Sequence, residues 1–292
     1  MTSQVMSGIS TGDSLFHNRV AVLATMHRKE QVIAPIIEPQ LGLNILVADK
    51  LDTDKFGTFT RDIARNGTQI EAARLKAAAA LEITGATIAI ASEGSFTPHP
   101  VIPYLPSNRE LIVFIDKQHD LEIVGESFTT ETNYHHLVVE SYPQALKFAQ
   151  KIGFPHHALI VMSQETQGNQ IIKGITTEAE LEIAVNSILA STAKAHIETD
   201  MRAMYNPTRM KNIARATQDL VTKIKSCCPK CSTPGFAITE RIAGLPCAAC
   251  HTPTHLTLAT VYECQKCGFT QEKLYPNGEE YADPGQCMYC NP

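Results

Sequence analysis

Four Cys-x-x-Cys pairs lie close to the C-terminal end of this chain, and no cysteine precedes Cys227. A Cys-x-x-Cys turn lets two thiolates converge on one cation, and two such turns supply the four sulfur ligands that zinc prefers. The paired residues are Cys228, Cys231, Cys247, Cys250, Cys264, Cys267, Cys287 and Cys290. Eight ligands predict two four-cysteine zinc sites and leave Cys227 as the spare cysteine.

The spacing leaves open which pairs share a metal. Consecutive pairing closes loops of about 15 and 19 residues, both normal for zinc ribbons, and the strand-like stretches "GFAITERIAG" and "FTQEKLYPNG" fall inside them. We therefore expect consecutive pairing, with a crossed arrangement as the alternative. Iron in a rubredoxin-like site is the alternative metal. Redox dithiols would need a thioredoxin-like context that the surrounding sequence lacks.

The charge of residues 227–292 limits what the cysteine-rich end can bind. Its basic residues are Lys230, Arg241, Lys266 and Lys273, and its acidic residues are Glu240, Glu263, Glu272, Glu279, Glu280 and Asp283. Binding to the phosphates of nucleic acids needs clustered Lys and Arg, and the whole chain carries a net charge of -5. We expect a folding module or a protein-docking module rather than a nucleic-acid ribbon.

The N-terminal segment 1–17 has neither a basic start nor an apolar run, so it is predicted to be a disordered leader and not a signal peptide. No stretch of the chain approaches 18 apolar residues, which disfavours a membrane span. These features predict a cytoplasmic protein, where paired cysteines mean metal more often than disulfide.

Residues 18–198 alternate between buried-strand patterns and helical patterns. Residues 19–27 read as a strand, and "GTQIEAARLKAAAALEITG" reads as a helix with Thr68 as N-cap and Gly85 at its end. This alternation predicts an α/β fold with a mixed sheet flanked by helices. A basic amphipathic connecting helix is expected over 199–226, followed by two zinc ribbons over 227–292.

Three stretches resemble the inosine-triphosphate pyrophosphatase superfamily, enzymes that hydrolyse non-standard nucleoside triphosphates. They are "ATMHRKE", "GTQIEAARLKAAAALEITGATIAIASEGSF" and "NPTRMKNIARA". The resemblance implies that Glu71 and Glu93 hold a magnesium ion, that Lys29 and Arg209 hold the phosphates, and that Thr25 orients them. The whole chain also resembles an uncharacterised bacterial family, a domain of unknown function, through "FGTFTR", "NRELI", "TDMRA" and the cysteine-rich end.

The chemistry of triphosphate hydrolysis suits these residue types, because it needs a metal held by carboxylates and cations on the phosphates. Thr25, Lys29 and Glu93 follow predicted strands, and ligands bind at the carboxyl ends of strands in open α/β sheets. His27 in the first turn and Arg202 in the late basic stretch are further candidates for phosphate contact.

Two functions therefore stand at this stage. The first is a magnesium-dependent hydrolase that resembles the nucleoside-triphosphate pyrophosphatases. The second is a non-catalytic protein that recognises a small anionic ligand and docks onto a protein partner through its zinc ribbons.

Overall fold

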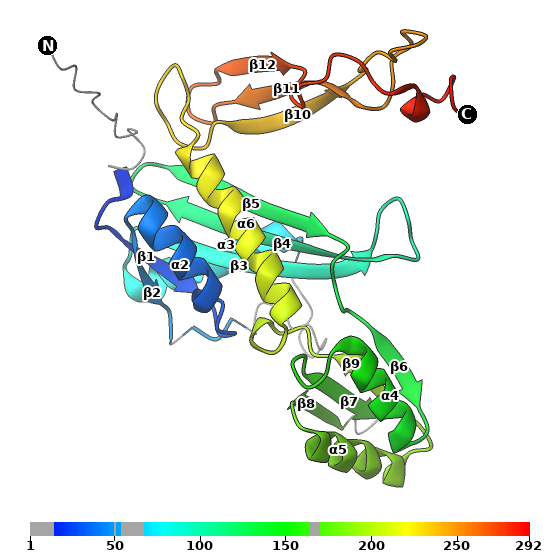
Figure 1. Ribbon diagram of the computed structural model, residues 1–292. Coiled ribbons are helices and arrows are strands. Elements are labelled where there is room, and N and C mark those ends of the chain that lie inside the picture. Colours follow the sequence, from blue (N-terminus) through cyan, green and yellow to red (C-terminus); the bar gives the residue numbers. More distant parts are fainter. Residues whose placement is uncertain (1–14, 50, 54–66, 164–169) are drawn as a thin grey trace, which may run out of the picture.

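The computed structural model describes residues 15–49, 51–53, 67–163 and 170–292. Their strands form three separate sheets of five, four and three strands. Figure 1 shows the five-stranded sheet at the centre, the four-stranded sheet at one end and the three-stranded cysteine module at the other. The prediction of a mixed α/β fold followed by a small cysteine module is confirmed.

The five-stranded sheet has the order β2-β1-β3-β4-β5 and mixes two kinds of pairing. β1 pairs in parallel with β2 and β3, whereas β3, β4 and β5 form an antiparallel meander. The strands are β1 (Val20–Ala24), β2 (Asn44–Val47), β3 (Ile88–Pro98), β4 (Pro106–Asp116) and β5 (Leu121–Thr129). β3 and β4 run well past the end of β1, so polar residues of the longer strands lie beyond its carboxyl end.

Helices cover both faces of this sheet: α2 (Glu30–Leu41) and α6 (Pro207–Lys225) lie on one face and α3 (Gln69–Thr84) on the other (Figure 1). Strand alternation divides the apolar side chains of β3 between the faces. Ile88 and Ile90 pack with α2 and α6, whereas Ala89 and Ala91 pack with the alanines of α3.

A capping box starts α3, as the position of Thr68 predicts. The Thr68 side chain accepts from the Glu71 amide, and the Glu71 carboxylate accepts from the Thr68 amide at 2.7 Å. Together these bonds satisfy two of the free amides at the helix start. Gly85 ends the helix in the left-handed region, at φ 69°, which a residue without Cβ adopts at little cost.

A second, all-antiparallel sheet follows in the order β6-β9-β7-β8. Its elements are β6 (His136–Val139), α4 (Tyr142–Ile152), β7 (Leu159–Ser163), β8 (Ile171–Ile175), α5 (Glu178–Ser191) and β9 (Ala195–Thr199). It has its own apolar cluster, in which Phe148 and Leu181 of the helices meet Val161 and Ile197 of the strands. One α/β body was expected over 18–198, and in the described residues this stretch contains two sheets, each with its own apolar core residues.

α6 is a core element as well as a connection. It runs from the short helix η2 (Ala203–Tyr205), beside the four-stranded sheet, to the cysteine module (Figure 1). Ile213, Leu220 and Val221 are fully buried against β4, β5 and α2. The amphipathic pattern of the expected connecting helix therefore corresponds to an apolar face that packs on the five-stranded sheet.

The end of the expected N-terminal leader is ordered. Residues 1–14 lie outside the described residues, but Phe16 is fully buried and its ring contacts Phe114 edge-on at 5.3 Å. The expectation of disorder is thus wrong for residues 15–17, because the apolar Phe16 belongs to the core. Among the described helices, none combines the length and the apolar character needed to cross a membrane.

Candidate metal centres and the charged end of the central sheet

The cysteine module is a meander of β10 (Ala237–Ala243), β11 (Thr257–Glu263) and β12 (Thr270–Leu274), with a short helix η3 (Pro284–Gln286) near its end. Its eight paired cysteines form two groups, and within each group the ligand atoms lie within 4.8 Å of one another. The proximal site contains Cys228, Cys231, Cys264 and Cys267, and the distal site contains Cys247, Cys250, Cys287 and Cys290. The expected consecutive pairing is wrong, and the crossed arrangement is the one formed.

The meander explains the crossed pairing. β10 and β11 are antiparallel, so Ala237 at the start of β10 pairs with Glu263 at the end of β11. The cysteine pairs that flank these two positions meet at one end of the sheet. The second and fourth pairs meet at the other end, where Ala259 pairs with Leu274. β11 was not predicted, although its pattern "TLATVYE" lies between the second and third pairs and favours this arrangement.

The sulfur positions fit a tetrahedral metal. Across the proximal site, Sγ–Sγ distances are 3.7 Å for Cys228–Cys267 and 3.6 Å for Cys231–Cys264. Across the distal site they are 3.8 Å for Cys247–Cys290 and 3.7 Å for Cys250–Cys287. A tetrahedron with Zn–S bonds of about 2.3 Å places its sulfurs about 3.8 Å apart. A disulfide needs about 2.0 Å, so the sulfurs are not oxidised pairs, and each group could hold a metal ion.

The surroundings of the thiols favour the metal-bound form. The hydroxyl and amide of Thr233 lower the pKa of Cys231 to about 6, and Thr252 does the same for the pKa of Cys250. In contrast, the neighbouring thiols Cys250 and Cys247 raise the pKa of Cys290 to about 12. Four thiolates at one point therefore need a cation, and a divalent ion would supply the missing positive charge.

The second group of predicted site residues lies where β1 ends. Thr25 is buried and its hydroxyl accepts from the His27 amide at 3.3 Å. His27 is partly exposed in the turn that leads to α2. The buried Lys29 amine reaches β3, where it donates to Ser92 Oγ at 2.7 Å and to the Ser92 carbonyl at 3.2 Å.

Burial, followed by the nearby cations Arg209 and Lys76, lowers the pKa of Lys29 to about 7. Glu93 and Glu110 act in the opposite direction. Lys29 thus belongs to a buried group of three cations and two carboxylates. Loss of the Lys29 proton balances the charge of this group.

Glu93 lies on the other face of β3. It follows Ala89 and Ala91 in the strand alternation and forms a buried ion pair with Lys76 of α3. Lys29 bonds to Ser92, whose side chain shares the face of Ile88 and Ile90. Lys29 and Glu93 therefore approach the end of the sheet from opposite faces.

Glu71 has a structural role in this arrangement. Its carboxylate accepts from the Thr68 amide at 2.7 Å and from the Thr68 hydroxyl at 2.8 Å. These hydrogen bonds lower the pKa of Glu71. In the parts of the chain that the structure describes, the two cysteine groups are the clusters that bring three or more metal-ligating side chains together. A magnesium site built on Glu71 and Glu93 has no support among those residues.

The predicted arginines are both ion-paired. Arg209 is inaccessible to solvent and bonds to Glu110 at 2.8 Å and to the Met201 carbonyl at 2.6 Å. Arg202 bonds to Asp200 at 2.6 Å, beside the four-stranded sheet. The structure thus brings Lys29, Glu93 and Arg209 to one end of the central sheet, whereas Arg202 lies beside the four-stranded sheet.

Two members of this buried group, Glu110 and Lys76, were not predicted from the sequence. Glu110 stands opposite Gly94 in the β3–β4 register, and a Cβ at Gly94 would lie 2.4 Å from the Glu110 carboxylate. One signal was present: Asn108 and Glu110 occupy alternate positions directly before the apolar run "LIVFI". Alternation places both on the face that packs against α6, where a buried carboxylate requires a cation.

The fold and the cysteine groups together define a class: an α/β protein with a C-terminal module of two four-cysteine groups, each of which could hold a metal ion. The chain belongs to the family described as Domain of unknown function (DUF6671), whose model matches residues 76–292. The expectation of an uncharacterised domain family is confirmed. The resemblance of the N-terminal part to the inosine-triphosphate pyrophosphatase superfamily has no counterpart in this match and stays a prediction.

The other comparisons add little. The search of curated proteins found no match. Among solved structures, the chain is similar to protein VC0702 from Vibrio cholerae, with 9% identity over 70% of this chain and 94% of that chain and a TM-score of 0.32. A likeness of this degree carries no inference about function.

Proposed function

We propose that this chain is a zinc-dependent binding protein whose cysteine module docks onto a protein partner. The supporting observation is the surface around the distal site. Tyr281, Met288 and Tyr289 are 51%, 57% and 70% exposed there. Tyrosine and methionine are enriched at protein interfaces relative to other surfaces, and Met288 and Tyr289 are the spacer residues of a metal-binding turn.

The charge of this surface indicates the kind of partner. Residues 275–292 contain Glu279, Glu280 and Asp283 and no Lys or Arg. Four thiolates around one divalent ion add two further negative charges. A partner segment with Lys or Arg next to apolar side chains complements this surface, whereas nucleic-acid phosphates are repelled.

Affinity capture followed by reconstitution tests this proposal. The zinc-loaded full chain retains a specific protein, which is then purified and shown to bind directly. The double variant Met288→Ser/Tyr289→Ser should lose this binding. Ile183→Ser is the matched control, because Ile183 is 70% exposed on α5, away from the module. Equal binding by the wild type and the double variant would contradict the proposal.

A second candidate, a small anionic ligand at the end of β1, has one observation in its favour. The buried group of Lys29, Lys76, Arg209, Glu93 and Glu110 carries one excess positive charge when Lys29 is protonated. An anion next to Thr25 and Lys29 would compensate this charge. Hydrolysis of a phosphate anhydride is the reaction that the family resemblance implies for such a ligand.

A screen of nucleoside triphosphates with magnesium tests this second candidate. Pyrophosphate release by the wild type that is abolished in Glu93→Gln would support hydrolysis. Nucleotide binding without turnover would support a binding role, and absence of both would exclude the candidate.

A further inference from the structure

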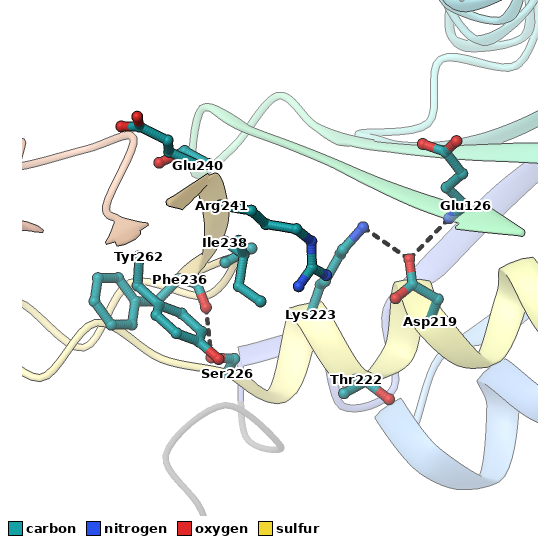
Figure 2. Close-up of a pocket in the computed structure, with 12 residues that line it drawn as sticks. Glu126, Asp219, Thr222, Lys223, Ser226, Phe236, Ile238, Glu240, Arg241 and Tyr262 are labelled. Atoms are coloured by element: carbon teal, nitrogen blue, oxygen red, sulfur yellow. Dashed lines mark hydrogen bonds and ion pairs between the residues drawn. The ribbon is translucent and has the colours of Figure 1, made fainter. Parts of the chain in front are cut away.

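A pocket lies between the cysteine module and the central sheet. Its volume is about 660 Å³, and it is lined by β10, by the last turns of α6, by Glu126 of β5 and by Tyr262 of β11 (Figure 2). Volumes of about 300 to 1,000 Å³ are typical of small-molecule sites. No cysteine and no residue of the charged end of the central sheet is among the residues that line the pocket.

One wall of the pocket is apolar and held in place. Phe236 is buried, and its ring lies 5.6 Å from that of Tyr262. The Phe236 amide donates to the Ser226 carbonyl at the end of α6, and the Ser226 hydroxyl donates to the Phe236 carbonyl. Phe236 also packs with Cys228 and Cys264 of the proximal site. Ile238 extends this wall and is 36% exposed. The wall is therefore preformed by the metal site and α6.

The opposite wall is polar, and its charges are already paired. Asp219 and Lys223 form an ion pair at 2.7 Å. Asp219 also accepts from the Glu126 amide at 2.8 Å, and Lys223 donates to the Val124 carbonyl at 2.9 Å. The Glu126 carboxylate pairs with Arg109 and points away from the pocket in Figure 2.

Besides Lys223, Arg241 is the basic residue that lines the pocket. Its side chain extends from β10 towards α6 in Figure 2, whereas the side chain of the neighbouring Glu240 points the other way. Among the described residues, the Arg241 guanidinium has no hydrogen-bond or ion-pair partner. A guanidinium group has donors in a fork that matches a carboxylate or another oxyanion.

We propose that this pocket binds a small organic anion, with the acidic group on Arg241 and a ring or branched apolar body against Phe236, Ile238 and Tyr262. The ligand would lie across the joint between the cysteine module and α6, so its binding would fix the module against the central sheet.

The test uses the zinc-loaded full chain and the fluorescent probe 8-anilinonaphthalene-1-sulfonate, a planar apolar anion. Arg241→Gln should raise the dissociation constant of the probe about tenfold, as loss of a charge-assisted contact does, and Arg241→Lys should have a smaller effect. Lys273→Gln is the matched control, since Lys273 is an exposed cation on β12 outside the pocket. Lys273→Gln should leave the dissociation constant of the probe within about twofold of the wild-type value, in line with the weak effect of exposed charges.

A second measurement locates the probe. The methyl signals of Ile238 should shift in NMR spectra on titration with 8-anilinonaphthalene-1-sulfonate. Equal dissociation constants for the wild type and Arg241→Gln would overturn the proposal. So would an equal loss in Arg241→Gln and Lys273→Gln, or binding without any shift of the Ile238 methyls. A bound zinc content equal to that of the wild type checks that each variant is folded.

Discussion

The buried Lys29 amine makes the free energy of unfolding depend on pH. Burial lowers the pKa of Lys29 from 10.5 to about 7 in the folded chain. Between these values the unfolded chain binds a proton that the folded chain does not, so the contribution of Lys29 to the free energy of unfolding rises with pH across this window. We expect Lys29→Met to remove this contribution and to flatten the rise in stability between pH 7 and pH 10.

Urea unfolding at both ends of the window measures this difference. Lys147→Met is the control, because Lys147 is exposed on α4. If the stabilities of Lys29→Met and Lys147→Met depend on pH in the same way, the pKa of Lys29 is not lowered in the folded chain.

Arg209 and Glu110 form a buried ion pair, and removal of either side chain alone should destabilise the protein. Both side chains are inaccessible to solvent, and Asn108 donates to the same carboxylate at 2.9 Å. Removing one partner leaves a buried charge without compensation, so Arg209→Met should lower the free energy of unfolding by about 3–5 kcal/mol. The double variant Glu110→Met/Arg209→Met should be less destabilised than the sum of the two single variants. Additive losses in a double-mutant cycle would contradict this coupling.

At the scale of elements, Glu71 stabilises the start of helix α3 through its capping box with Thr68. As its hydrogen bonds lower the pKa of Glu71 in the folded chain, its contribution is present at neutral pH and is lost as pH falls through the folded pKa. Glu71→Gln should therefore lower the thermal midpoint at pH 7, and this effect should shrink as pH falls through the lowered pKa of Glu71. Glu180, which forms the same capping box in α5, is the matched comparison. A metal-ligand role would instead appear as a loss of bound magnesium in Glu71→Gln alone.

Local patterns predicted the elements better than the site. Thr68 and Gly85 mark both ends of α3 because caps depend on residues close in sequence. The partners of a buried charge depend on register and helix packing instead. Lys76 meets Glu93 because α3 crosses β3, and Glu110 meets Arg209 because α6 returns to β4 about a hundred residues later. Strand alternation indicates that Glu110 is buried, but no periodic signal in the sequence identifies Arg209 as its partner or pairs Lys76 with Glu93.

At the scale of the whole molecule, the division of the strands into separate sheets could not be predicted from the sequence either. The periodicity of "HALIVMS" identifies a strand but does not say which sheet it joins. The four-stranded sheet became visible only through its pairings, such as Leu137 with Ile197. The cysteine module differs, because antiparallel strands between four ligand pairs determine which pairs meet.

The crossed pairing makes a prediction about metal content. We expect two zinc ions per wild-type chain. Cys228 and Cys264 share the proximal site, so Cys228→Ser/Cys264→Ser should lose one ion and keep the other. Cys228 and Cys247 belong to different sites, so Cys228→Ser/Cys247→Ser should lose both, because a cage with three thiolates binds zinc far more weakly. Zinc quantified by mass spectrometry after gel filtration distinguishes the arrangements, since consecutive pairing predicts the reverse result for the two variants.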